Sequence, residues 1–400
     1  SLDQTMGNRR KKQKIMSAKE KELYQMVLDS SRLNLSYTDI VSVEEARVIA
    51  RALKNRRAQT RSMTLYKMNI IDEAVEIIME ALHNNVNVRY LHLLHTSITS
   101  TGAKALSQML TANTTLNFFG LSNCSINRGN FKNLTEGMKS NSSLEQVHFT
   151  ENQIGVEGAG ELAKVLTSNS SIQLLSIGEE QILSRGTRSL ADALAQSSLD
   201  ALSLQGVRIT YVGAKALAES LRNNNVLSRL HLDFNHIGDL GVRVLSENLK
   251  YNKGVKKLQL SGNSISNDGA MAIGDMLKVN SCLKALFLTD NMIGDKGTRA
   301  ISDGLKTNCH LTFLDLTNNQ IRKVGAKALA DALKWNTKLQ SLNLEDNEIG
   351  NFGVRAFAQV FKYNTTLRSC DLIGNNFIGQ LGVFVLVDAS KYNLYLEETL

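Results

Sequence analysis

The sequence predicts an α/β solenoid in which one short strand and one helix alternate along the whole chain. Three observations lead to this prediction. A unit of 28 residues recurs twelve times in phase from residue 60 onward. Within each copy the apolar residues follow first the two-residue period of a strand and then the period of a helix. Proline is absent from all 400 residues. Because proline is common in linkers between domains, its absence favours one continuous body.

The best-preserved unit runs from Leu311 to Lys338 and reads LTFLDLTNNQIRKVGAKALADALKWNTK. It contains the pattern LxxLxLxxNxI, which is typical of a leucine-rich repeat. The other units begin at Thr60, Val88, Leu116, Leu144, Ile172, Leu199, Leu227, Val255, Leu283, Leu339 and Leu367. The unit from Ile172 is one residue short, and a degenerate unit covers about residues 31–59. The sequence therefore predicts about 13 units.

The first part of each unit is expected to be a strand. Side chains alternate across a strand, so Leu314 and Leu316 point into the core while Phe313 and Asp315 point outward. Asn319 follows, where a buried amide can satisfy the backbone of the turn. The same position holds asparagine at Asn152, Asn235, Asn263, Asn291, Asn347 and Asn375, and it holds other residues at Met68, Thr96, Cys124, Glu180 and Val207. Met, Glu and Val are not expected to replace its hydrogen bonds, which predicts an irregular stack around residues 172–210.

The second part of each unit is expected to be a helix. After Gly325, the apolar residues Ala328, Leu329, Ala332 and Leu333 share one face. We expect the helix to end at Asn336, a residue type that tolerates a left-handed backbone. Equivalent asparagines stand at Asn85, Asn113, Asn141, Asn169, Asn224, Asn252, Asn280, Asn308 and Asn364. Four of them (113, 141, 169 and 364) fall in Asn-x-Ser/Thr sequons, which this repeat position explains without glycosylation.

No unit can bury its apolar face alone, so stability must come from stacking. The prediction is a curved leucine-rich-repeat solenoid, a horseshoe of about 13 strand–helix units over residues 31–396, with a parallel sheet on the concave face and helices on the convex face. Residues 17–30 are expected to form an N-terminal capping helix, because Ser17 and Glu20 have the spacing of a capping box. Leu23, Met26 and Val27 are expected to pack on the first unit.

The N-terminal segment, residues 1–16, is basic and is expected to be flexible. Residues 1–62 hold fourteen Lys/Arg and seven Asp/Glu, so they carry most of the net charge of +8. The rest of the chain is nearly balanced, which argues against nucleic-acid binding. No apolar run is long enough for a membrane span, and no secretory signal is recognised. The run Arg9, Arg10, Lys11, Lys12 and Lys14 is a solubilising tail, a nuclear-import signal or a tether to an anionic surface.

The sequence predicts neither a catalytic residue, nor a metal site, nor a cofactor. It contains no HExxH, GxSxG, CxxC or GxxxxGK[ST] motif. The glycines of GVEGAG (155–160) are in register with the turn before a helix, so they do not indicate a phosphate loop. The four cysteines, Cys124, Cys282, Cys309 and Cys370, are far apart and favour reduced thiols in a cytoplasmic protein.

The unit length and the recurring NxIGxxGAxALAxAL pattern resemble the ribonuclease-inhibitor-like subfamily of leucine-rich-repeat proteins. That subfamily includes ribonuclease inhibitor, Ran GTPase-activating proteins and the repeat domains of NOD-like receptors. The resemblance implies a protein-binding surface, commonly the concave face. It leaves three functions open: a non-catalytic scaffold or adaptor, which we favour; an activator of a small GTPase; or an immune-type sensor without a nucleotide-binding module.

The outward strand positions predict the binding surface. Its N-terminal half carries aromatic residues and histidines, which suit binding anchors: Tyr66, Tyr90, His92, His95, Phe118, Gln146 and His148. Its C-terminal half carries carboxylates, which would attract a basic protein partner: Asp233, Asp290, Asp315, Glu345, Asp346 and Asp371. Each half could instead be covered by the chain or be an ordinary solvated face. No cap follows Leu396, so exposed Phe384, Leu386 and Leu396 predict self-association through the C-terminal end.

Overall fold

The computed structural model of the chain describes residues 16–36, 42–67 and 72–375. Thirteen helices and thirteen strands alternate along this part of the chain. The strands are β1 (Arg32–Ser36), β2 (Ser62–Tyr66), β3 (Tyr90–Leu94), β4 (Phe118–Ser122), β5 (Gln146–Thr150), β6 (Leu174–Gly178), β7 (Ala201–Gln205), β8 (Arg229–His231), β9 (Lys257–Gln259), β10 (Ala285–Phe287), β11 (Phe313–Asp315), β12 (Ser341–Asn343) and β13 (Ser369–Asp371). The helices are α1 (Ala18–Asp29), α2 (Val43–Leu53), α3 (Asp72–His83), α4 (Ser100–Ala112), α5 (Arg128–Ser140), α6 (Gly155–Ser168), α7 (Leu183–Leu194), α8 (Tyr211–Leu221), α9 (Gly238–Leu249), α10 (Asn267–Leu277), α11 (Asp295–Thr307), α12 (Lys323–Leu333) and α13 (Gly350–Phe361).

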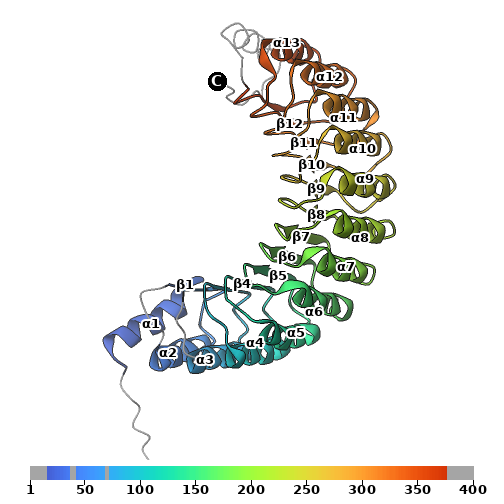
Figure 1. The fold of residues 1–400 in the computed structure, drawn as a ribbon. Coiled ribbons are helices and arrows are strands. Elements are labelled where there is room, and N and C mark those ends of the chain that lie inside the picture. Colours follow the sequence, from blue (N-terminus) through green and yellow to red (C-terminus); the bar gives the residue numbers. More distant parts are fainter. Residues whose placement is uncertain (1–15, 37–41, 68–71, 376–400) are drawn as a thin grey trace, which may run out of the picture.

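The strands form one parallel sheet in chain order, β1 to β13. The sheet lines the inner edge of a curved body and the helices cover the outer edge, as Figure 1 shows. Strands one unit apart pair in register, for example Leu314 with Leu342. The predicted fold class and number of units are confirmed. No helix in the described part of the chain is long and apolar enough to cross a membrane.

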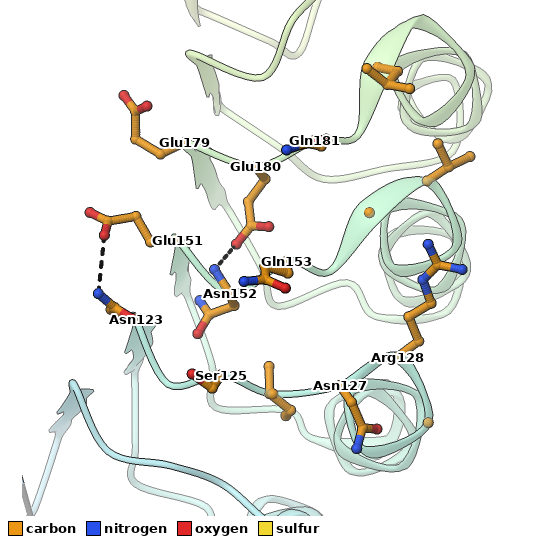
Figure 2. Close-up of a pocket in the computed structure, with 15 residues that line it drawn as sticks. Asn123, Ser125, Asn127, Arg128, Glu151, Asn152, Gln153, Glu179, Glu180 and Gln181 are labelled. Atoms are coloured by element: carbon orange, nitrogen blue, oxygen red, sulfur yellow. Dashed lines mark hydrogen bonds between the residues drawn. The ribbon is translucent and has the colours of Figure 1, made fainter.

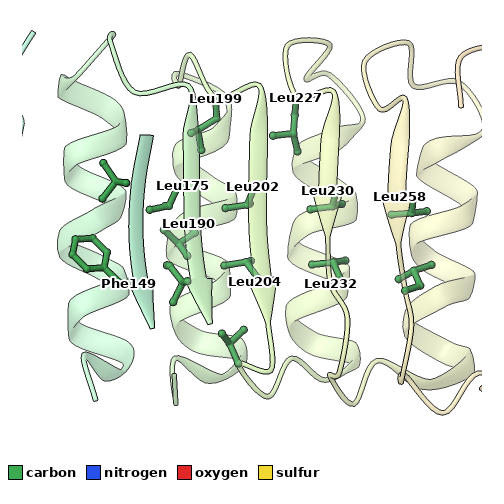
Figure 3. Packing of buried hydrophobic residues seen from close by; sticks show 14 of the residues in the cluster. Phe149, Leu175, Leu190, Leu199, Leu202, Leu204, Leu227, Leu230, Leu232 and Leu258 are labelled. Atoms are coloured by element: carbon green, nitrogen blue, oxygen red, sulfur yellow. The ribbon is translucent and has the colours of Figure 1, made fainter. Parts of the chain in front are cut away.

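The core lies between the sheet and the helices, and each unit adds the same layer to it. In the unit from Leu311, the residues Leu311, Leu314 and Leu316 are completely buried, and Leu329 and Leu333 meet them from α12. Figure 3 shows the equivalent leucines of neighbouring units side by side, with Leu202 and Leu204 beside Leu230 and Leu232. The described part contains one continuous apolar core from Val27 to Leu372. Each layer is therefore covered by the next one.

The asparagine after each strand is buried, as the sequence predicts. The Asn319 side-chain NH₂ donates to the carbonyls of Leu288, Leu316 and Thr317, each at 3.0 Å. Its carbonyl oxygen accepts from the backbone N–H of Ile293 at 3.0 Å. One side chain thus joins its own turn to the preceding unit and satisfies four buried backbone groups.

Two substitutes at this position replace part of that network. The Cys124 thiol lies 3.2 Å from the Leu93 carbonyl. The prediction that glutamate cannot replace asparagine is wrong for Glu180, because its carboxylate accepts from the backbone N–H groups of Asn152 and Ile154. A carboxylate supplies the acceptor half of the asparagine bonds. Within residues 172–210, where the sequence predicts an irregular stack, β6 and β7 keep the five-residue length of the earlier strands, and the strands shorten to three residues only from β8 onward.

The second row of asparagines, near the helix ends, differs from the expectation. Asn113, Asn141 and Asn308 follow their helices in extended conformation, with φ near −71°, and not in the left-handed region. Their side-chain amides form hydrogen bonds with backbone groups. The Asn308 NH₂ donates to the carbonyls of Leu277 and Asn280, at 2.8 and 3.2 Å. The sequon asparagines use their amides in the same way, for example Asn141 at 2.7 Å from the Leu110 carbonyl, so these amides are occupied in the fold.

The left-handed backbone instead occurs directly after the strands. His95, Asp290 and Asp346 have φ values of 51°, 54° and 51°. The same position in other units holds Lys67, Asn123, Glu151, Glu179, Gly206, Phe234, Gly262, Asn318 and Gly374, all with positive φ. Non-glycine residues adopt this conformation infrequently. A row of left-handed residues therefore runs along the edge of the sheet where the strands end.

The N-terminal helix α1 begins with the expected capping box: the Glu20 N–H donates to the Ser17 hydroxyl at 3.2 Å, and the Ser17 N–H donates to the Glu20 carboxylate at 2.6 Å. Val27 is completely buried and Leu23 packs against the core. The expectation that Met26 also packs there is wrong, since 43% of it is exposed. The basic segment 1–15 and the apolar residues expected to be exposed at the C-terminal end, Phe384, Leu386 and Leu396, lie outside the described residues.

The second asparagine row makes a prediction about stability. Replacing Asn308 with alanine removes four hydrogen bonds and leaves the carbonyls of Leu277 and Asn280 and the N–H groups of His310 and Leu311 without these partners. Each such group costs about 1–3 kcal/mol, so Asn308→Ala should lower the free energy of unfolding by about 2 kcal/mol or more. The control Thr307→Ala alters the exposed neighbour and should change it by less than about 0.5 kcal/mol. Urea unfolding followed by circular dichroism measures both, and equal effects would contradict the role assigned to Asn308.

Candidate functional site

The candidate site is a group of rings on the concave face, which we call the aromatic cluster: Tyr90, His92, Phe118 and His148. Tyr90 on β3 and Phe118 on β4 are paired in register. Their rings stack at 4.0 Å between centroids, with planes 12° apart. The Phe118 ring also meets His92 at 5.8 Å and His148 at 4.7 Å. The structure thus brings together four of the residues that the sequence predicts for the N-terminal half of the surface.

The other predicted residues of this half lie at the margin of the same surface. Tyr66 and His95 form a separate edge-to-face pair at 5.4 Å. Gln146 is exposed and pairs in register with Phe118 on the neighbouring strand. The rings of Tyr90, His92, Phe118 and His148 are each partly exposed and partly covered by one another. They form one apolar patch in the described structure.

Gly120 provides the space that the cluster needs. It lies between His92 on β3 and His148 on β5 in the register of the sheet. A Cβ atom at Gly120 would stand 2.7 Å from Cδ2 of His92 and 3.1 Å from a ring carbon of Phe118. The two rings therefore lie over the bare backbone of Gly120. A larger residue at this position would push them away from the sheet.

The histidines of the cluster are neutral at neutral pH. Burial, together with the neighbouring His148, lowers the pKa of His92 to about 4, and burial also lowers the pKa of His148. His92 is held by hydrogen bonds at both nitrogens, to the Tyr90 hydroxyl at 3.2 Å and to the Ser122 hydroxyl at 2.9 Å. Nε2 of His148 is buried and has no hydrogen-bond partner among the described residues. The cluster thus presents aromatic and uncharged polar groups.

The acidic half of the predicted surface is partly assembled. Burial raises the pKa of Glu345, and the nearby carboxylates of Asp371, Asp346 and Asp315 raise it further. Asp315 also accepts from the Thr317 hydroxyl at 2.7 Å. We refer to Asp315, Glu345, Asp346 and Asp371 as the acidic group.

The other two predicted carboxylates have local partners. Asp233 was expected to be a free surface group, and this is wrong: it is 5% exposed and accepts from the Ser261 N–H and the Gln259 side chain, both at 2.8 Å. Its burial between two turns explains the difference. Asp290 is exposed, and it accepts from the Asn318 side chain at 2.5 Å.

Sequence reasoning missed a second aromatic pair in the C-terminal half. Phe287 on β10 and Phe313 on β11 approach to 4.7 Å between ring centroids. The Lys257 ammonium lies 4.8 Å from the Phe287 centroid, which is a cation–π contact. Phe313 stands at the strand position of Tyr90 and Phe118, and Phe287 stands at that of His92, so the outward positions of the strands select both residues. The separation of aromatic and acidic halves is therefore less complete than the sequence indicates.

A groove lies at the edge of the sheet where β4, β5 and β6 end, with a volume of about 1110 Å³. Figure 2 shows Glu151 and Glu179 on its outer side and Glu180 directed inward to Asn152. Burial raises the pKa of Glu180, opposed by the backbone N–H groups of Asn152, Ile154 and Gln153. Among the described residues no group of three His, Cys, Asp or Glu side chains could hold a metal ion. The carboxylate of Glu180, the innermost of the groove, is therefore hydrogen-bonded to backbone N–H groups of the solenoid.

The lowered histidine pKa values make a prediction about pH. Between about pH 6.5 and the folded pKa of about 4, the unfolded chain binds protons that folded His92 and His231 do not bind. Stability is therefore greatest above pH 6.5 and should fall as the pH is lowered from 6.5 toward 4. The double variant His92→Gln/His231→Gln should show a shallower fall, while His236→Gln, at an exposed histidine, should behave like the unaltered chain. Urea midpoints between about pH 5 and 7 measure this, and identical slopes in all three proteins would refute it.

Comparisons with known proteins agree with this architecture. A family model described as "Leucine Rich repeat" matches residues 84–107, 140–163, 223–246, 251–274, 279–302, 307–330 and 336–358. A comparison with curated proteins gives no match.

Three solved structures match this chain to different extents. An internalin (InlF) from Listeria monocytogenes is 19% identical, with a TM-score of 0.50 over 93% of this chain and 92% of that one. A chain from the Rad7 and Elc1 complex in yeast is 13% identical, with a TM-score of 0.50 over 90% of each chain. Leiomodin-1 actin-binding site 2 is 22% identical, with a TM-score of 0.30 over 44% of this chain and 87% of that one. From its repeats, its parallel sheet and the full-length likeness to the first two structures, the chain is a solenoid of leucine-rich repeats.

Proposed function

We propose that this chain is a non-catalytic scaffold or adaptor that binds a protein through its concave face. The observation that supports this most strongly is the aromatic cluster. Stacked, partly exposed rings such as Tyr90 and Phe118 bury a large apolar area on binding and lose little side-chain entropy. They stand on strands that are paired on both sides, so the surface is already ordered before a partner arrives.

The acidic group adds electrostatic selection to this surface. Burial and then the repulsion of the neighbouring carboxylates raise the pKa of Glu345, and an approaching cation relieves that repulsion. A basic partner would therefore be attracted to this part of the concave face, and its association would be accelerated. The proposed partner carries an apolar region that meets the cluster and basic side chains that meet the acidic group.

The chain of hydrogen bonds from Tyr90 through His92 to Ser122 resembles the arrangement of a hydroxyl nucleophile with a histidine base. Two features favour a structural role for it. The low pKa of His92, about 4, makes its imidazole a weak base at neutral pH. No described carboxylate is hydrogen-bonded to this histidine, so no anion would stabilise a positively charged ring. These features support the proposal of a non-catalytic protein.

Two further assignments accompany the proposal. All four cysteines are unpaired, and burial raises the pKa of Cys124 to about 11, which suits inert thiols in a reducing, cytoplasmic environment. Helices of 11–14 residues in the units support placing the chain in the ribonuclease-inhibitor-like subfamily. A role in activating a small GTPase or in immune sensing is the alternative that this subfamily suggests.

The proposal is tested with the partner that affinity purification and mass spectrometry identify with the complete chain. Tyr90→Ala and Phe118→Ala should raise the dissociation rate, with a loss of about 1–2 kcal/mol or more for a true anchor. Glu345→Gln and Asp371→Asn should mainly slow association and weaken its dependence on salt. Surface plasmon resonance at several salt concentrations measures both rates.

Matched controls are available on the convex side. Phe352→Ala changes an exposed phenylalanine of α13, and Asp192→Asn an exposed carboxylate of α7. Both should leave the rates unchanged, and all variants should stay folded because these side chains lie outside the core. Wild-type rates for the Tyr90, Phe118, Glu345 and Asp371 variants would show that the concave face is not the interface.

The GTPase alternative leads to a separate expectation. With a panel of small GTPases, catalytic amounts of the chain should leave the rate of GTP hydrolysis at its intrinsic value, because a scaffold contributes no group to the reaction. Phosphate release under multiple-turnover conditions measures this rate. Stimulation of any one GTPase, lost on substitution of a repeat-edge residue, would replace the scaffold proposal with an activator.

A further inference from the structure

A row of exposed apolar side chains lies on the opposite edge of the solenoid from the groove of Figure 2. We call this the strand-start edge, since here each helix ends and the chain turns to the next strand; in Figure 3 it is the side on which Leu199 and Leu227 lie. Tyr251, Val279, Trp335 and Tyr363 occupy the same position in four of five consecutive units, just after the last residues of α9, α10, α12 and α13. They are 78%, 45%, 72% and 81% exposed, and Trp335 is the only tryptophan of the chain.

Backbone groups of this edge are hydrogen-bonded within the fold. The asparagine that follows each row residue forms such hydrogen bonds. For example, the Asn336 NH₂ donates to the carbonyls of Leu305 and Asn308, at 2.7 and 3.0 Å. Its carbonyl oxygen accepts from the N–H groups of Lys338 and Leu339, at 2.9 and 2.8 Å. The loop after α12 is therefore held by four hydrogen bonds of one side chain, and Trp335 beside it is exposed.

The same edge carries a concentrated positive charge. The segments 250–256, 278–284, 306–312, 334–340 and 362–368 hold three, two, one, two and two Lys/Arg residues, ten in total, and no Asp or Glu. The equivalent segments of the six preceding units, from residue 83 to residue 228, hold three Lys/Arg and two Asp/Glu. The charge is therefore a local property of the last units.

Part of this charge is available to a partner. Lys250, Lys278, Lys306 and Lys334 each pair with a carboxylate three residues earlier on the helix. The other six cations form no ion pair with a described residue, and all of them are exposed: Lys253, Lys256, Lys284, Lys338, Lys362 and Arg368. They flank the apolar row along its whole length. Aromatic anchors beside unpaired cations fit a ligand that alternates apolar and acidic groups.

We propose that the strand-start edge, from Tyr251 to Arg368, is a second protein-binding surface that takes an extended acidic segment of a partner polypeptide. Packed helices lie about 8–10 Å apart, and a segment in polyproline II conformation has three residues per turn and advances about 3.1 Å per residue, so every third side chain lies on the same face at about this spacing. Successive row residues therefore meet every third residue of such a segment, with the acidic residues between them facing the lysines. Val279 of the row and Thr307, at the same position of the fifth unit, have no aromatic face for a nucleobase, which favours a polypeptide over a nucleic acid.

The test uses a fluorescein-labelled peptide of about 15 residues, with phenylalanine at every third position and Asp or Glu between. Its fluorescence anisotropy should report saturable binding to the complete chain that weakens as salt is raised from about 50 to about 300 mM. The peptide with Asn and Gln in place of its acidic residues should bind at least about ten-fold more weakly. Trp335→Ala/Tyr363→Ala and Lys338→Glu/Arg368→Glu should each reduce binding by about ten-fold or more.

Two controls separate this surface from the concave face. Phe352→Ala, at an exposed aromatic residue of the convex side, should bind the peptide like the unaltered chain. Tyr90→Ala/Phe118→Ala should do the same, so failure here and failure of the concave-face proposal give different results. Circular dichroism and thermal unfolding verify that the variants, all at exposed or partly exposed positions, remain folded.

Three outcomes would overturn the proposal. The first is no saturable binding, and the second is binding that the edge variants leave unchanged. The third is a single-stranded oligonucleotide of equal charge that binds more tightly than the peptide and is lost in the same variants, which would make the edge a nucleic-acid interface.

Discussion

The fold depends on how each unit satisfies the backbone of its two turns. Parallel strands are joined here through helices, so every unit packs two turns against its neighbours, and the N–H and C=O groups buried there need hydrogen-bond partners within the protein. Two rows of asparagine side chains supply hydrogen-bond partners for these backbone groups. Asn319 serves the turn after its strand and Asn336 the turn after its helix, and each also bonds to the preceding unit. Stacking and hydrogen bonding therefore reinforce one another from unit to unit.

This arrangement explains why surface properties run in rows. Because every unit repeats the same bonds, residues at one position of the repeat stand beside their equivalents on the next unit. The stacked pair of Tyr90 and Phe118 is one such row, and the left-handed residues after the strands form another. A substitution at an outward position thus changes the surface without disturbing the stack. The repeat makes separate surfaces possible on one rigid body.

In the last units the concave face and the strand-start edge carry opposite charges. The acidic group lies on the concave face near β11 to β13, while the cations gather where the same strands begin. Exposed charges that are more than a Debye length apart, about 8 Å at physiological salt, interact only weakly in water. Partners of different charge could therefore bind at the same time. The aromatic cluster, with its neutral histidines, adds a region in which apolar contact dominates.

Periodicity alone was sufficient to predict the strands, the helices, their parallel order and the buried leucines, because these follow from a spacing that each unit repeats. It also predicted which side chains of β3 to β5 share the concave face. It could not predict the burial of Asp233, the bonds of Glu180 or the extended backbone at Asn308, because each depends on backbone groups of a neighbouring unit. The stacking of Tyr90 on Phe118 and the low pKa of His92 likewise arise from the distance and cover that adjacent strands provide. These properties arise from contacts between residues that are 26 to 31 positions apart in the sequence. The spacing of residues within one unit does not specify such contacts.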